Sequence, residues 1–184
     1  MREGFVLDIG CCTGRHLEML AERGIQGLGI DISPLALKLA LGAGVNCEMA
    51  DINTYVSPRA VDTILTLGGN GGIIGTIDKL PAFLQRLASW LTPDGSIIFT
   101  STDWCRIDPG LLDSATARTE RRYPGDWQIR FHLGDRIGPW FPWAVFDRKS
   151  LEKACETAGL RIFKYKSWSG GVYYAALLRK VDPS

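Results

Sequence analysis

The chain has 184 residues, which is enough for one domain with a sizeable buried core and short for two. Its 21 lysines and arginines nearly balance 20 aspartates and glutamates, and the formal net charge is +1. This balance excludes a global positive field that would steer the protein onto nucleic acid or an anionic membrane.

The cysteine pattern and the hydropathy pattern exclude several further classes. The five cysteines are odd in number and lack CxxC spacing, which argues against a zinc ribbon and indicates reduced thiols. Residues 1–10 contain no apolar segment with a cleavage site, and the most apolar later window, 64–77, holds Asn70 and several glycines. We expect a cytoplasmic protein with no signal peptide, no membrane span and no metal site.

Short β-branched runs alternate with helical patterns along the first hundred residues, which is typical of βα units and a parallel sheet. The expected strands are residues 5–9, 27–31, 45–49, 61–67 and 95–101. One helix begins at Ser33 and Pro34, an N-cap followed by proline at the first helical position. A second helix, 79–91, places five large apolar residues on one face and ends at the turn 92–95.

The rhythm changes between residues 104 and 146. Apolar and polar residues alternate over 126–133, and Gly134-Asp135 is a hairpin signal before residues 137–146. Pro139 and Pro142 would cost hydrogen bonds in a central strand, so this arm is expected at an edge or as a cover. A helix at 148–158 and strands at 160–168 and 172–180 follow. We expect a single domain, 1–184, with 104–146 as an inserted substrate-side region.

The stretch VLDIGCCTGRH, residues 6–16, is a strand-to-helix turn with glycines. Such a turn brings backbone N–H groups and a helix N-terminus close to a ligand. A nicotinamide fingerprint, GxGxxG, would need glycine where Cys12 and Arg15 stand. The dinucleotide interpretation therefore fails at two of three glycines.

Three acids lie at the ends of the first three expected strands. Asp8 precedes the first glycine by two residues and could accept hydrogen bonds from an ammonium group or a water molecule. Asp31 ends the second strand, where a carboxylate can accept both ribose hydroxyls. Asp51 follows the third strand, where it can accept from a base amino group while Ile52 packs on the ring. The series suits a neutral adenosine with a cationic amino-acid tail better than a pyrophosphate.

With these motifs the sequence resembles the class I S-adenosylmethionine-dependent methyltransferase family, from Phe5 to about Lys180. DIGCCTG is similar to the family's first motif, GIDIS to its second, MADI to its third and VDTILTLGGN to its fourth, and LTPDGSIIF to its turn into strand five. The region after strand four is similar to small stand-alone bacterial methyltransferases.

The resemblance implies an α/β fold, a Rossmann-like three-layer α/β/α sandwich. Its seven-stranded, mostly parallel sheet would have the order 3-2-1-4-5-7-6 with the last strand antiparallel, and a β-hairpin would be inserted after strand 5. It implies S-adenosyl-L-methionine as cofactor and S-adenosyl-L-homocysteine as product. The cofactor-binding residues implied are Asp8, Gly10, Cys11, Gly14, Asp31, Ile32, Asp51, Ile52, Leu67 and Gly68.

The chain departs from the family pattern in two places. Cys12 stands where the family usually has a middle glycine. Only four residues precede the first expected strand, where the family commonly has helices that cover the cofactor. Either the start is truncated or the cover comes from elsewhere, and a homodimer or a partner chain is one source we consider.

The candidate catalytic residues are Asn70, Asp103 and His132. Asn70 follows strand four, where the family orients the acceptor, although GGNGG also suits a turn. Asp103 closes strand five at the ligand-binding edge of the sheet, with capping as the alternative. His132 is the best candidate base if the acceptor needs one, and exposure on the hairpin is the alternative.

Two groups of side chains in the inserted region are candidates for contact with the acceptor. The tryptophans could form an apolar wall of the acceptor pocket or simply cover the core; they are Trp104, Trp127, Trp140 and Trp143. The arginines could hold a substrate anion or form a solvated helix face; they are Arg118, Arg121 and Arg122.

We therefore expect a methyltransferase that moves the sulfonium methyl to an oxygen, nitrogen or carbon of a small-molecule acceptor by in-line displacement. An RNA or protein methyltransferase is one alternative, disfavoured by the neutral charge. A non-catalytic cofactor-binding partner subunit is another.

Overall fold

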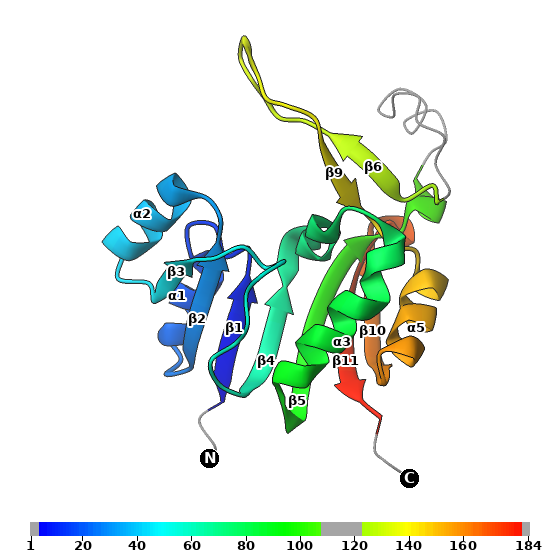
Figure 1. Cartoon of the computed structure of the whole chain (residues 1–184), viewed down its shortest axis with the longest axis horizontal. Helices are drawn as coiled ribbons and strands as arrows, with labels where there is room; N and C mark the ends of the chain where they lie inside the picture. The colour runs from blue at the N-terminus through cyan, green and yellow to red at the C-terminus, as the bar shows by residue number, and fades with distance from the viewer. Residues whose placement is uncertain (1–3, 108–122, 182–184) are drawn as a thin grey trace.

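A computed structural model describes residues 4–107 and 123–181 of the chain. Its main sheet has seven strands in the order β10-β11-β5-β4-β1-β2-β3 (Figure 1). The strands span β1 (Phe5–Ile9), β2 (Gln26–Asp31), β3 (Cys47–Met49), β4 (Val61–Thr66), β5 (Leu91–Thr102), β10 (Leu160–Trp168) and β11 (Tyr173–Lys180). The first five strands pair in parallel, and β11 runs antiparallel to both of its neighbours, β5 and β10.

The described helices span α1 (Arg15–Ala21), α2 (Pro34–Gly42), α3 (Leu80–Trp90) and α5 (Arg148–Thr157). Two of them, α2 and α5, begin at residues whose side chains cap them. Ser33 accepts a hydrogen bond from the N–H of Ala36 at the start of α2, and Asp147 accepts one from the N–H of Ser150 at the start of α5. Short 3-10 turns are η1 (Leu67–Ile74), η2 (Ile77–Lys79), η3 (Trp104–Arg106) and η4 (Ser169–Gly171).

The core divides into two clusters because the helices cover different parts of the sheet. The larger cluster joins the apolar faces of α3 and α5, which lie together in front of the sheet in Figure 1, to the central strands. The smaller cluster lies between α1, α2 and the β2–β3 end; it contains Cys11, Leu17, Leu37, Ala40, Val45 and Cys47. No helix in the two described ranges is long and apolar enough to cross a membrane.

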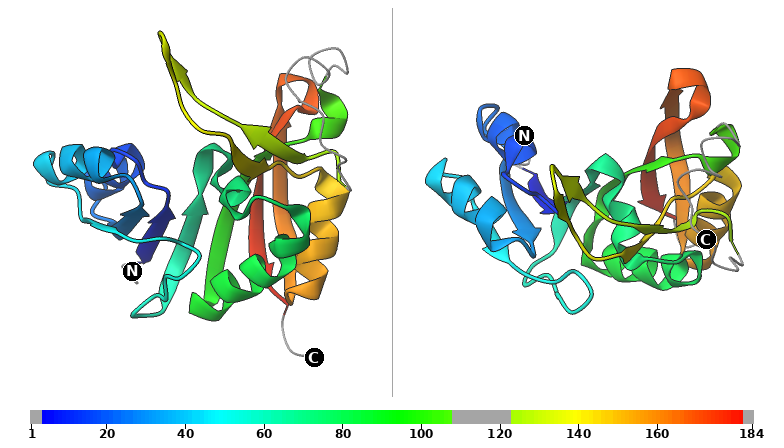
Figure 2. Two further views of the ribbon diagram at one scale, coloured as in Figure 1. Left: turned by 45° about the horizontal axis from the view of Figure 1, so that its top comes forward. Right: turned by 90° about the horizontal axis from the view of Figure 1, so that it is seen from above.

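An arm of paired strands leaves the body after β5. Its base pairs β6 (Asp126–Ile129) with β9 (Phe141–Ala144), and its outer part pairs β7 (His132–Leu133) with β8 (Arg136–Ile137). Seen from above, the arm crosses over the carboxyl ends of the sheet strands (Figure 2). Side-chain oxygens anchor the arm and the segment after it: the N–H of Ile77 donates to Asp126 Oδ1 at 2.8 Å, and the N–H of Phe146 donates to Ser101 Oγ at 3.0 Å.

The predicted fold class is confirmed, including the sheet order, the antiparallel strand and the inserted hairpin. Most boundaries agree to within two residues, and the largest difference is at the start of the fifth strand. The fifth strand begins at Leu91, so that it contains the predicted turn 92–95. Leu91 pairs with Val61 but Ser96 pairs with Thr63, so the register of the β4–β5 ladder shifts at the predicted turn.

Candidate cofactor site

The turn between β1 and α1 holds its backbone in left-handed conformations. Gly10, Cys12 and Gly14 have φ of 72°, 53° and 83°. A Cβ on Gly10 would lie 2.4 Å from Asn70 Nδ2, so only glycine fits there. Cys12 pays a conformational cost at its position, but its N–H donates to Asp31 Oδ2 at 2.9 Å.

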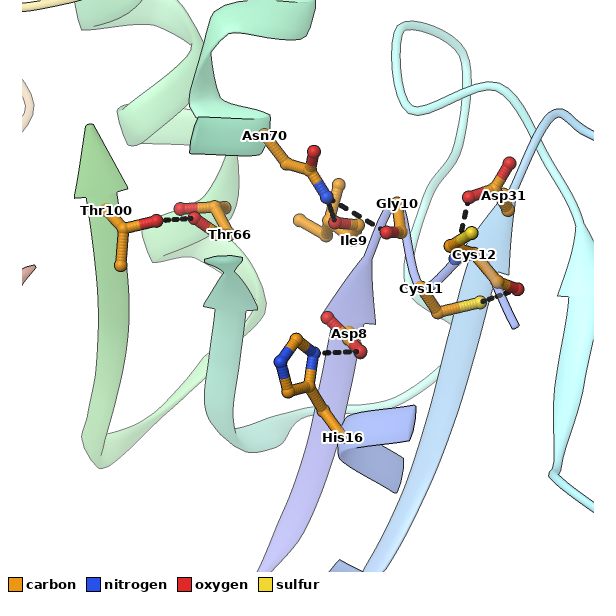
Figure 3. A network of polar contacts seen from close by, with 10 residues as sticks. All are labelled: Asp8, Ile9, Gly10, Cys11, Cys12, His16, Asp31, Thr66, Asn70 and Thr100. Carbon is orange, nitrogen blue, oxygen red and sulfur yellow. Dashed lines mark hydrogen bonds and ion pairs between the residues drawn. The ribbon is translucent and has the colours of Figure 1, made fainter. Parts of the chain in front are cut away.

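Asp8 is a buried carboxylate at the end of β1. It is 1 % exposed, and its Oδ2 has no hydrogen-bond partner among the described residues. His16 Nδ1 lies 3.6 Å from Oδ2, beyond hydrogen-bond distance (Figure 3). Burial raises the pKa of Asp8, and the neighbouring His16 partly offsets this effect. A cationic donor bound beside Asp8 would satisfy the orphaned oxygen and stabilise the ionised carboxylate.

Asp31 and Asp51 follow the next two strands and have backbone partners. Asp31 accepts from the N–H groups of Cys12 and Ser33, one on each oxygen. Asp51 Oδ1 accepts from the backbone and side-chain N–H groups of Asn53, both at 2.8 Å. These bonds fix the orientation of the carboxylates, and each oxygen can accept more than one hydrogen bond.

A first cavity, of about 310 Å³, brings Asp31 and Asp51 together with apolar walls. The strand ends contribute Ile9, Gly10, Ile30, Ile32, Ala50, Ile52 and Asn53, and the opposite wall consists of Ile73 and the arm residues Phe141, Pro142 and Trp143. Ile52 is buried in the core, whereas Ile32 is exposed. Apolar walls with a few convergent polar groups suit a flat ring with hydroxyls.

A second cavity, of about 380 Å³, lies on the other side of the glycine turn. It contains Asp8 and His16, residues 10–13, Arg15, Leu67, Gly68 and Asn70. Gly10 belongs to both cavities, so they meet at the turn. The structure therefore places the expected cofactor residues around two adjoining spaces, apart from Gly14, whose Cα packs on Val45.

Asn70 joins this turn to the loop after β4. Its Nδ2 donates to the carbonyl oxygens of Ile9 and Gly10, both at 2.9 Å (Figure 3). The adjacent Gly69 N–H donates to Thr100 Oγ1 at 3.1 Å, and that hydroxyl donates to the carbonyl of Thr66 at 3.2 Å. The loop is thereby tied to β1 on one side and β5 on the other, which makes Asn70 a positioning residue for the turn.

Three other expected residues lie differently. Cys11 points its side chain under β2, and burial raises the pKa of its thiol to about 12, so only its backbone belongs to the site. Asp103 is buried and caps η3 through a hydrogen bond from the N–H of Cys105, and it lines a separate depression beside α5. His132 is exposed on β7 and lines neither cofactor-site cavity. Arg118, Arg121 and Arg122 lie outside the described residues.

The arm contributes residues that sequence reasoning did not assign to the cofactor site. Trp143 packs where a Cβ on Gly72 would lie 2.4 Å from its Nε1, and Pro142 packs on Gly75. These contacts seat the arm on the loop after β4. In the sequence, the only indication of these contacts is that Gly72 and Gly75 leave room for large side chains. Nothing local shows that Trp143 and Pro142 fill that room, because the two segments are far apart in the sequence.

The sheet order and the two adjoining cavities are typical of α/β domains that bind a cofactor containing a nucleoside. Residues 6–95 match the methyltransferase domain family. Over 142 residues the chain is 27 % identical to trans-aconitate 2-methyltransferase of Streptomyces avermitilis, covering 72 % of this chain and 49 % of that protein. It is 32 % identical over 108 residues to phosphoethanolamine N-methyltransferase 3 of Arabidopsis thaliana, covering 55 % of this chain and 21 % of that protein.

Among solved structures, an S-adenosylmethionine-dependent methyltransferase from Bacteroides fragilis in complex with S-adenosyl-L-homocysteine superposes with a TM-score of 0.80. It is 26 % identical, with 98 % of this chain and 74 % of that chain covered. Residues 6–95 therefore carry a domain of the methyltransferase family, and the described chain shares the fold of S-adenosylmethionine-dependent methyltransferases. It spans less than half the length of the curated relatives it matches.

Proposed function

We propose that the chain binds S-adenosylmethionine across the two cavities and transfers its methyl group to a small-molecule acceptor. The observation that carries the proposal is Asp8, a buried carboxylate with an orphaned oxygen in the second cavity. The cofactor's ammonium group is the donor that this oxygen needs.

The first cavity supports the nucleoside half of the proposal. Asp31, oriented by two backbone N–H groups, would accept hydrogen bonds from the ribose hydroxyls. Ile32 and Ile52 offer apolar surface to the base, and Asp51 can accept from its amino group. Phe141 and Trp143 of the arm line the same cavity, which supports the arm as a cover for the bound nucleoside.

When bound, the cofactor supplies a methyl group on a positively charged sulfur, which an oxygen, nitrogen or carbon of the acceptor displaces. The protein's part is to align the reactants and exclude water. Asn70 serves that alignment by holding the carbonyls of Ile9 and Gly10. A small-molecule acceptor is supported by the names of the relatives, which act on trans-aconitate and phosphoethanolamine.

The test separates the two cavities. S-adenosylhomocysteine has both the nucleoside and the amino-acid end, whereas methylthioadenosine lacks the amino-acid end. Asp8→Asn should weaken binding of S-adenosylhomocysteine by about 10- to 100-fold, the value of one charged hydrogen bond, and leave methylthioadenosine unchanged. If the variant weakens the binding of both ligands equally, or weakens the binding of neither, Asp8 does not bind the ammonium group. A screen of small acceptors with methyl-labelled cofactor then tests the transfer.

A further inference from the structure

The outer part of the arm has apolar side chains that the rest of the described chain leaves at least half exposed. Phe131 is 73 % exposed and Leu133 is 78 % exposed, and Ile137 and Trp140 are also exposed. A two-stranded ribbon is at best marginally stable in water by itself, and large contiguous apolar surface usually marks a binding site. We therefore expect this surface of the arm to bind another molecule.

A chain of aromatic contacts connects this surface to the wall of the first cavity. The ring centroids of Phe131 and Phe141 are 5.4 Å apart, and those of Phe141 and Trp143 are 6.3 Å apart. Phe141 and Trp143 line the cavity that contains Asp31 and Asp51. The apolar track, defined as Trp143, Phe141, Phe131 and Leu133, thus runs outward from the cofactor site.

The inner end of the apolar track is held by a contact with the loop after β4, and the arm that carries the track extends over one edge of the sheet. Trp143 sits against Gly72 in the loop that also carries Asn70, and the arm crosses over the carboxyl ends of the strands (Figure 2). A surface that served only to join two proteins would have no need to continue into the cavity wall. Continuity with the cavity favours an occupant that reaches from the arm to the cofactor site.

We infer that the apolar track binds the acceptor, and that the acceptor is a small amphiphile with an extended aromatic or aliphatic body and its methyl-accepting atom at one end. The inference rests on the proposed function, because it names the substrate class of the same site. Its body would lie along Phe131 and Leu133, and its reactive end would reach the junction of the two cavities near Gly10 and Asn70.

The probes are 4-ethylphenol, 4-butylphenol and 4-hexylphenol, titrated by calorimetry into the full chain with and without S-adenosylhomocysteine. Affinity should rise with chain length by up to about fourfold per methylene, as expected for burial of apolar surface. The variant Phe131→Ser/Leu133→Ser should flatten this rise. The matched control Leu35→Ser/Leu39→Ser removes two similarly exposed leucines from α2 and should keep it.

Each contrary result is informative. S-adenosylhomocysteine binding that persists without any rise along the phenol series, or a rise that survives the arm variant, overturns the inference and leaves the proposed function standing. Failure of the wild type to bind S-adenosylhomocysteine removes both. Light scattering that finds a dimer abolished by the arm variant would assign the surface to a second copy. Sedimentation with phosphatidylglycerol vesicles, lost in the same variant, would assign it to a lipid surface.

Discussion

Asn70 links two segments of the cofactor site that are sixty residues apart, and its removal should affect binding more than a comparable change elsewhere. Asn70→Ala deletes two hydrogen bonds of 2.9 Å to backbone carbonyls. At about 0.5–1.5 kcal/mol each, their loss should lower the free energy of unfolding by about 1–3 kcal/mol. Because the turn at Gly10 is no longer held, affinity for S-adenosylhomocysteine should fall at least tenfold, or about 1.4 kcal/mol.

Asn46 provides the matched control. Its Nδ2 also donates to a backbone carbonyl, that of Gly27, at 2.8 Å, and it lines neither cofactor-site cavity. Asn46→Ala should therefore lower stability by about 0.5–1.5 kcal/mol without changing affinity. Urea unfolding and calorimetry measure the two quantities. If both variants lose stability and neither loses affinity, Asn70 supports only the fold and the reasoning about the turn is refuted.

Three further predictions concern single groups. Cys12→Gly should raise the free energy of unfolding by about 1 kcal/mol and preserve cofactor affinity, because it relieves a left-handed backbone; a loss of stability in urea unfolding would contradict this. Burial raises the pKa of Asp8 above 3.8, so ionisation of this carboxyl opposes folding. In thermal unfolding, the unliganded wild type should therefore lose stability relative to Asp8→Asn as the pH rises from about 4 toward neutrality. A stability difference that does not change with pH would contradict this prediction. Burial alone would raise the pKa of Asp147, but hydrogen bonds from Ser150 and Tyr123 lower it. Tyr123→Phe should therefore lower the free energy of unfolding by about 1–3 kcal/mol at pH 7, and by less as the pH falls through the pKa of Asp147. A loss of stability that is independent of pH would show that the phenol does not act on this carboxylate.

The sequence was sufficient for the features that depend on local pattern. The strand ends could be predicted from β-branched runs, and because parallel strands end at one edge, Asp8, Asp31 and Asp51 could be predicted to lie together. The glycines of residues 6–16 predicted the strand-to-helix turn between β1 and α1. Comparison with the family pattern singled out Cys12, and in the structure its N–H donates to Asp31 Oδ2.

Features that depend on contacts between distant segments could not be predicted. Whether Asn70 faces an acceptor or the backbone of β1 depends on how the loop after β4 docks, which no local pattern encodes. For His132 the sequence left two interpretations open, a catalytic base or an exposed hairpin residue, and the structure shows it exposed. The seating of Trp143 on Gly72 requires two segments about seventy residues apart to meet.

Binding of the cofactor is the central claim, and calorimetry with S-adenosylmethionine and S-adenosylhomocysteine tests it most directly, with NADH as the control ligand. We propose Asp31 as the carboxylate that binds the ribose, so Asp31→Ala is the variant to compare with the wild type. The account predicts micromolar binding of both cofactor forms by the wild type, its loss in Asp31→Ala, and no binding of NADH. Absence of binding by the wild type, or binding that Asp31→Ala leaves unchanged, would contradict the account.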